Sequence, residues 1–113
     1  MRRLCGRAVR WAVPAFGVLF LIAAPLRAQD APALYKSKCA ACHGPDGTGN
    51  VPTGKSLGVT DLTSGDVQKQ TDAQLTDSIA KGKGKKMPAY KGKITDDQIT
   101  GLVGYLRELA KKK

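Results

Sequence analysis

The chain has 113 residues, and its 19 lysines and arginines outnumber its 9 acidic residues, which gives a formal net charge of +10. A chain of this length forms one small domain rather than several. It contains no Ser-His-Asp set, no paired acid/base site and no phosphate-binding loop, so the sequence argues against hydrolytic or nucleotide-dependent catalysis.

The first 28 residues have the pattern of a bacterial secretory signal peptide. An apolar stretch at 11–26 follows a basic start, and Leu26-Arg27-Ala28 ends on a small residue, as a cleavage site does. The basic residues are Arg2, Arg3, Arg7 and Arg10. The apolar stretch is shorter than the ~20 residues that span a bilayer comfortably, although an uncleaved anchor remains the alternative. Either way, the pattern predicts export, to the periplasm or its equivalent, and cleavage would leave a mature domain of residues 29–113.

The mature domain is too small to be stabilised by its hydrophobic core alone. It has 85 residues and a net charge of +5, because the leader holds five of the basic residues and none of the acidic ones. Domains this small usually need a staple, and outside the cytosol that staple is commonly a disulfide. Here only Cys39 and Cys42 remain, too close together for a useful loop. Both phenylalanines and the tryptophan lie in the leader, so a large flat prosthetic group is the better account of the core.

A first helix is predicted to begin at Asp30 and Pro32. Aspartate is a favourable N-cap, and proline is tolerated in the first turn. We expect this helix to continue through Tyr35 to Cys42. Tyr35 precedes Cys39 by four residues and should therefore share its face.

The stretch Cys39-Ala40-Ala41-Cys42-His43 has the spacing of covalent c-type haem attachment. On a helical turn Cys39 and Cys42 share a face, so each thiol could add to one haem vinyl group, with His43 as the proximal iron ligand. Two alternatives compete. A zinc site needs four ligands, and no further cysteine or histidine follows His43. A thioredoxin-like dithiol is expected in a βαβ setting, whereas the surroundings here are helical and glycine-rich.

Residues 44–70 show no helical period and are interrupted repeatedly by glycine and proline. So long an irregular run is uncommon in a small domain unless it serves a function or wraps a bound group. Wrapping a haem fits, and its expected inward residues are Leu57, Val59 and Leu62.

Two further helices are predicted by their capping boxes. Thr71 and Gln74 begin one, which should end at Gly82; Thr95 and Gln98 begin the other. The last helix carries an apolar stripe at helical spacing, formed by Ile99, Leu102, Val103, Leu106 and Leu109.

Between these helices lies a polar, glycine-rich loop that contains Met87. This is the only methionine besides Met1, and it has no apolar period around it, so a packing role is not favoured. The loop lysines would attract acidic partners; the alternative is that they only keep the protein soluble. These lysines are Lys81, Lys83, Lys85 and Lys86, whereas Lys111, Lys112 and Lys113 complement the end of a helix.

Together these motifs resemble the class I c-type cytochromes, in particular the small monohaem, cytochrome c6-like bacterial group, over residues 30–113. The resemblance implies an all-α class I cytochrome c fold, with three main helices and haem-wrapping loops. It also implies one covalently attached haem c per chain.

The resemblance assigns roles to further residues. Met87 would be the second axial ligand, opposite His43. The carbonyl of Pro52 would accept a hydrogen bond from the other nitrogen of His43 and so fix the ring; a plain turn residue is the alternative. Tyr90 would contact the haem.

The resemblance also implies a helix crossing. Tyr105 would lie against Ala31, where the family usually has glycine. Gly104, which has no side chain, would reduce the bulk at this contact.

With both axial positions filled, the resemblance implies a one-electron carrier rather than an enzyme. It would be a monomer that is neither embedded in a membrane nor bound to nucleic acid. Its partners would be redox proteins with acidic docking surfaces, such as a membrane oxidoreductase or a terminal oxidase. Two alternatives stay open: a tethered cytochrome domain serving one respiratory complex, and a haem gas or redox sensor in which Met87 is labile.

Overall fold

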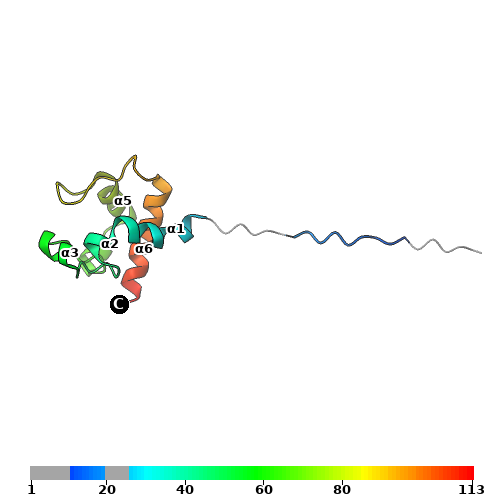
Figure 1. Cartoon of the computed structure of the whole chain (residues 1–113), viewed down its shortest axis with the longest axis horizontal. Helices are drawn as coiled ribbons and strands as arrows, with labels where there is room; N and C mark the ends of the chain where they lie inside the picture. The colour runs from blue at the N-terminus through cyan, green and yellow to red at the C-terminus, as the bar shows by residue number, and fades with distance from the viewer. Residues whose placement is uncertain (1–10, 20–25) are drawn as a thin grey trace, which may run out of the picture.

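The computed structural model describes residues 11–19 and 26–113. Within them the chain forms six helices and no strand (Figure 1). They are α1 (Leu26–Lys38), α2 (Ala40–His43), α3 (Pro52–Leu57), α4 (Gly65–Gln68), α5 (Asp72–Lys81) and α6 (Asp96–Lys111). The predicted all-α fold with three main helices is confirmed, since α1, α5 and α6 are the longest.

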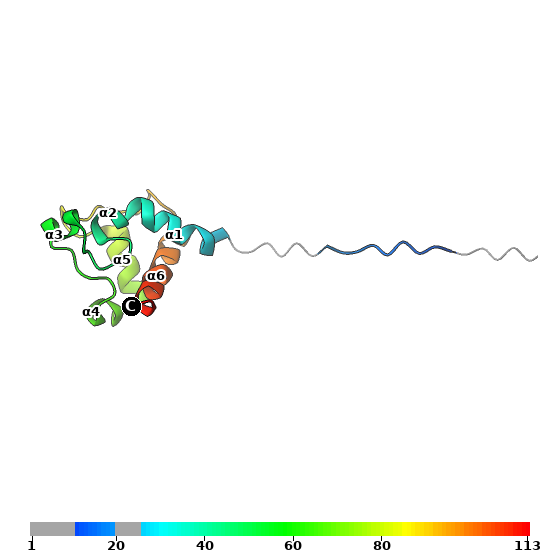
Figure 2. The ribbon, with the colours of Figure 1, turned by 60° about the horizontal axis from the view of Figure 1, so that its bottom comes forward.

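Helix α6 is the centre of the packing. It contacts both α1 and α5, and α2 contacts α1 and α3 (Figure 2). The predicted apolar stripe of α6 is confirmed, because all five of its residues are buried. Both predicted capping boxes are present: the side chain of Thr71 accepts from Gln74 N, and that of Thr95 accepts from Gln98 N. The core therefore lies where α1, α5 and α6 meet.

The first helix differs from the prediction at both ends. It begins at Leu26, so Asp30 lies inside it rather than at its cap. The four preceding residues, Leu-Arg-Ala-Gln, all favour helix, which outweighs the capping preference of aspartate. The helix also stops at Lys38. Cys39 has φ −117°, far from the helical value, and separates α1 from the single turn of α2.

Residues 44–70 were predicted to be irregular, but they contain the two short helices α3 and α4. Pro52 occupies the first turn of α3, where its missing N–H costs nothing. Ser64 caps α4, and its side chain accepts from Val67 N. Helices of six and four residues are too short to give a readable period. The rest of the stretch runs around the domain as loops.

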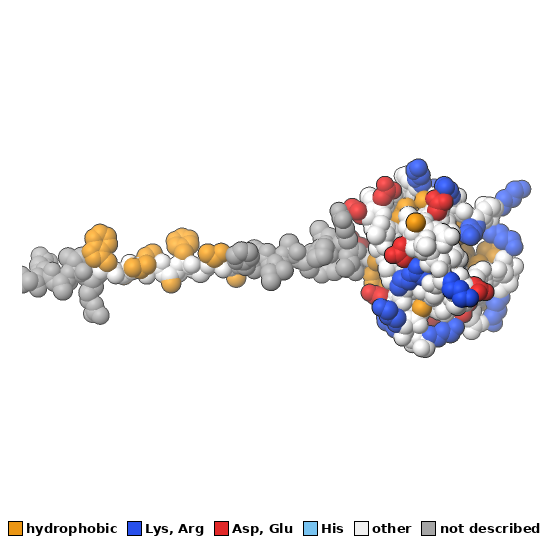
Figure 3. Space-filling view, turned by 180° about the vertical axis from the view of Figure 1, so that it is seen from behind, with side chains coloured by type: hydrophobic (Ala, Val, Ile, Leu, Met, Phe, Trp, Pro, Cys, Tyr) orange, Lys and Arg blue, Asp and Glu red, His pale blue; other side chains and the backbone are white. Residues whose placement is uncertain are grey.

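Part of the leader lies outside the described residues, including its predicted basic start, Arg2, Arg3, Arg7 and Arg10. Residues 11–19 form neither helix nor strand, and their large apolar side chains are exposed, as for Trp11 at 87% and Phe16 at 91% (Figure 3). The predicted cleavage after Ala28 falls within α1. In the described part of the chain, no helix combines the length and the apolar character needed to cross a bilayer.

Candidate cofactor site

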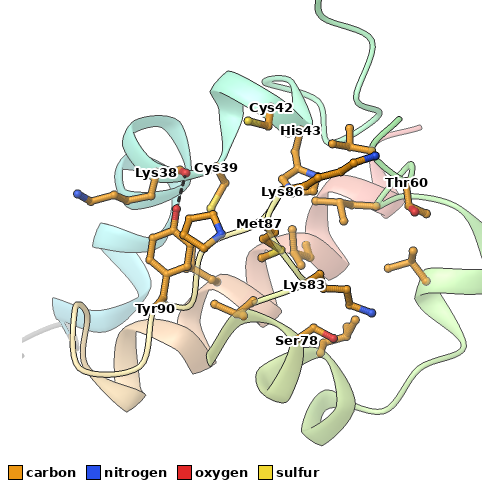
Figure 4. A pocket seen from close by; sticks show the side chains of 18 of the residues that line it. Lys38, Cys39, Cys42, His43, Thr60, Ser78, Lys83, Lys86, Met87 and Tyr90 are labelled. Atoms are coloured by element: carbon orange, nitrogen blue, oxygen red, sulfur yellow. Dashed lines mark hydrogen bonds between the residues drawn. The ribbon is translucent and has the colours of Figure 1, made fainter. Parts of the chain in front are cut away.

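One cavity of about 430 Å³ brings together the two predicted attachment cysteines and the two predicted iron ligands (Figure 4). Cys39, Cys42 and His43 enter it from α2 and the residue before it, and Met87 enters from the loop after α5. The volume lies in the range of sites that bind a cofactor. The predicted wrapping residues Leu57, Val59 and Leu62 all line it. The other apolar walls are Val67, Leu75, Ile79, Leu102 and Leu106.

The two cysteines are half-buried and form no disulfide. Burial, with a smaller contribution from the charge of Cys42, raises the pKa of Cys39 to about 11. Reactive dithiols use thiolates with lowered pKa values, so this environment does not suit the dithiol alternative. Among the described residues, no three His, Cys, Asp or Glu side chains are placed to hold a metal ion. The cysteines are instead placed for addition to a bound group in the cavity.

His43 ends α2 and is partly buried beside the cavity. Burial lowers its pKa, so the ring is held neutral, which is the form that binds metals. Its Nδ1 atom is buried without a hydrogen-bond partner. The predicted bond to the carbonyl of Pro52 is therefore not formed. Pro52 is exposed and is not among the residues that line the cavity; because it begins α3, its carbonyl is directed along that helix.

The loop at residues 82–90, the Met87 loop, folds back tightly on itself. Lys83 N donates to Met87 O at 3.0 Å, and Met87 N donates to Lys83 O at 3.3 Å. Gly82 makes this possible: its φ is +71°, and a Cβ there would lie 2.5 Å from the carbonyl oxygen of Met87. Tyr90 N donates to Ile79 O at 3.1 Å, which ties the end of the loop to α5. The turn places Met87 in the cavity, which His43 of α2 also lines (Figure 4).

Tyr90 lines the cavity, as predicted for a residue beside the cofactor. Its hydroxyl also donates to the carbonyl of Lys38 at 3.0 Å, and burial raises its pKa. Lys86 Nζ donates to Leu57 O, also at 3.0 Å. These two hydrogen bonds could not be predicted from the sequence.

Tyr35 supports the attachment turn. Its hydroxyl, buried and with a pKa raised by that burial, donates to Gly44 O at 2.7 Å, directly after His43. Its ring lies 5.2 Å from that of Tyr105 between centroids. The expectation for Gly104 was wrong: it is exposed, and a Cβ added there would meet no atom within 4 Å. The Tyr35–Tyr105 pair is one of the contacts between α1 and α6.

Two supporting residues were missed by the sequence analysis. Gly54 packs α3 so closely on the attachment turn that a Cβ would collide with the carbonyl oxygens of Cys42 and Gly49. Arg107 donates to Gln68 O at 2.9 Å and to Gln70 O at 2.6 Å. These bonds fix the end of the wrapping segment, residues 44–70, to α6. The position of Arg107 as the only arginine of α6 was a signal that could have been used.

The residues present fit a covalently held haem. Two free thiols, an unpartnered neutral imidazole and a thioether share one cavity with mainly apolar walls. Thiols supply covalent attachment, and nitrogen and thioether sulfur are ligands that suit haem iron.

Comparisons with known proteins agree with this fit. The model of the family described as cytochrome C oxidase, cbb3-type, subunit III, matches residues 27–106. The cytochrome c6 of Leptolyngbya boryana is 35% identical over 79 residues, which are 70% of this chain and 88% of that protein. The cytochrome c6 of Synechocystis sp. is 31% identical over 80 residues, 71% of this chain and 63% of that protein.

A larger protein and a solved structure are also similar. The chain is 31% identical to the cbb3-type cytochrome c oxidase subunit CcoP of Azospirillum brasilense over 83 residues, which are 73% of this chain but only 28% of that subunit. The solved structure of the KustC0563 c-type cytochrome matches with a TM-score of 0.66 and 30% identity, covering 71% of this chain and 96% of that one. With the fold, the attachment motif and the cavity in agreement, the chain belongs to the class I c-type cytochromes, monohaem proteins that hold haem c covalently.

Proposed function

We propose that the mature chain is a soluble one-electron carrier, with His43 and Met87 as its two axial ligands. The observation that carries the proposal is the cavity, which gathers Cys39, Cys42, His43 and Met87 from two distant parts of the chain. When bound, the haem supplies the Fe(II)/Fe(III) couple, and a methionine ligand raises its potential.

The protein's contribution is to hold the ligands and to exclude water. Burial keeps His43 neutral and so available as a ligand. The apolar walls from α5, α6 and the wrapping segment lower the local polarity, which limits the reorganisation that accompanies a change of charge. Because His43 and Met87 would fill both axial positions, no position would be left for a substrate. We therefore propose an electron carrier and not an enzyme.

Export and acidic partners belong to the same proposal. The predicted leader supports export, and Lys38, Lys83 and Lys86 line the cavity, where they favour partners with acidic docking surfaces. The similarity to an oxidase subunit makes a terminal oxidase a candidate partner. We propose a monomer that does not bind nucleic acid.

A tethered domain is the second candidate. It is favoured by the similarity to CcoP and by the exposed apolar side chains of residues 11–19. The intact mass of the purified protein separates the two candidates. The carrier should lack residues 1–28, and a tethered domain should retain them.

The Met87→Ala variant tests the ligation directly. It should keep its haem through Cys39 and Cys42 but lose the weak band that a methionine sulfur–iron bond gives at the red end of the ferric spectrum. The potential should fall, since the thioether no longer favours the reduced iron. Survival of that band in the variant would show that Met87 is not the ligand.

A further inference from the structure

The Met87 loop is joined to the two walls of the cavity by two side chains. Lys86 Nζ donates to Leu57 O at 3.0 Å, and the Tyr90 hydroxyl donates to Lys38 O at 3.0 Å. Leu57 is the last residue of α3, and Lys38 is the last residue of α1. The side chains of Lys86 and Tyr90 therefore reach from one loop to opposite sides of the same opening (Figure 4).

Both acceptors suit these donors. The last carbonyls of a helix have no partner within it and carry partial negative charge, so a hydroxyl or an ammonium group satisfies them well. The backbone hydrogen bonds of the Met87 loop stay local: they run within the loop, to α5 before it or to the residues just after it. In the described structure, the hydrogen bonds that join this loop to α1 and α3 are those of Lys86 and Tyr90.

We infer that Lys86 and Tyr90 are positioning residues: they act as two latches that hold Met87 in the cavity and so set how readily another ligand replaces it. This inference rests on the proposed ligation by Met87. It also separates Lys86 from its neighbour Lys85, which is exposed and has no hydrogen bond or ion pair in the part of the chain that the structure describes.

The latches have a measurable consequence because a competing ligand can bind only when the loop opens. Its apparent affinity is scaled by the fraction of molecules that are open. Loss of one hydrogen bond of ordinary strength should increase that fraction, and hence the affinity, about 2- to 10-fold. If the loop opens as one unit, both latches must break, so the two increases should multiply in the double variant.

Imidazole titration of the ferric holoprotein tests this, with loss of the red-end sulfur–iron band as the readout. Tyr90→Phe and Lys86→Gln should each increase imidazole affinity about 2- to 10-fold. The matched controls are Tyr105→Phe, whose hydroxyl has no hydrogen bond in the described structure, and Lys85→Gln, which removes the same charge one residue away. Both controls should leave the affinity unchanged, and Lys86→Arg should restore it.

Each result bears on one proposal. If the wild-type protein lacks the band, the ligation by Met87 is wrong. If the band is present but Tyr90→Phe and Lys86→Gln bind imidazole as the wild type does, the ligation stands and the latches are wrong. Equal effects of Lys85→Gln and Lys86→Gln would also overturn the latches, because they would show that charge alone matters. Should Tyr90→Phe fail to fold, the exposed Lys86 still decides the question.

Discussion

Gly82 shows how one residue can control the methionine side of the cavity. Its φ of +71° is strained for any other residue, and a Cβ would meet Met87 O at 2.5 Å and Ala89 N at 2.8 Å. These are backbone atoms, which cannot move without moving the loop. The position of Met87 therefore depends on the absence of a side chain five residues earlier.

Gly82→Ala should displace the Met87 loop and destabilise the holoprotein by about 1–3 kcal/mol, with a weaker sulfur–iron band. Gly84→Ala is the matched control: Gly84 also has a positive φ, of +60°, but a Cβ there would meet no atom within 4 Å. Denaturation midpoints and ferric spectra of both variants check this. If the two variants lose the band equally, backbone strain explains the effect and the close contact does not.

At the scale of residues, the sequence predicted which side chains line the cavity better than it predicted the hydrogen bonds between them. The spacing of Cys39, Cys42 and His43 and the isolated Met87 predicted which residues share the cavity, because those residue types have few other uses in such a pattern. The bonds of Tyr90 and Lys86 join residues far apart in sequence, so no local pattern could predict them. The role of Pro52 came from family resemblance alone, and the buried Nδ1 of His43 has no partner.

Among the elements, Asp61 in the stretch at residues 44–70 binds Lys113, which follows α6. The carboxylate accepts from Thr63 Oγ1 at 2.6 Å and Thr63 N at 2.8 Å, and from Lys113 Nζ at 2.9 Å. The hydroxyl of Thr63, followed by the ammonium of Lys113, lowers the pKa of Asp61. The charged form is therefore the one that the folded protein favours.

When folding lowers the pKa of an aspartate, the charged carboxylate stabilises the folded protein at pH values above the pKa of the unfolded state, about 3.9. This contribution is lost as the pH falls through the pKa of the folded state. Asp61→Asn should therefore reduce stability at neutral pH and flatten its decline below about pH 4. Asp66→Asn is the control, since Asp66 is almost fully exposed in a 3.7 Å pair with Lys69. Urea denaturation across this pH range checks the prediction, and identical pH profiles for Asp61→Asn and the wild type would contradict it.

Helix prediction succeeded where a cap and an apolar period agreed. In α5 and α6 the threonine caps and the buried stripe give the same boundaries, and the structure confirms them. In α1 the proposed cap Asp30 conflicted with the helix-forming residues before it, and the conflict was resolved in favour of the longer helix. The single turns α3 and α4 depend on packing around the cavity, which no short sequence window contains.

For the whole molecule, the structure distinguishes the four lysines of the predicted docking surface by the bonds that their side chains make. Lys81 is paired with Asp77 at 2.8 Å, and Lys86 is bound to Leu57 O. Lys83 and Lys85 remain, with no side-chain hydrogen bond or ion pair among the described residues. Lys86 keeps its charge and adds to the field beside the cavity, but Lys83 and Lys85 are the lysines of the Met87 loop whose side chains are free to move toward an acidic partner.

Lys83→Glu with Lys85→Glu should slow electron transfer to an acidic redox partner about 10-fold at low salt, and the difference should shrink as added salt shortens the Debye length. Lys111→Glu with Lys112→Glu changes the net charge equally at the far end of α6 and should have a smaller effect. Stopped-flow rates at several ionic strengths check this. Equal slowing by both pairs would mean that net charge, and not a local surface, governs docking.

The fold class and the family could be predicted from the sequence because one motif, two capping boxes and one apolar stripe all indicate the same architecture. The choice between carrier and sensor could not, since it depends on how firmly Met87 stays bound.

Addition of carbon monoxide to the reduced wild-type protein at neutral pH measures this most directly. If His43 and Met87 fill both axial positions, the visible spectrum should not change. A rapid and complete spectral change would show an available iron position, contradict the closed carrier and favour a gas sensor.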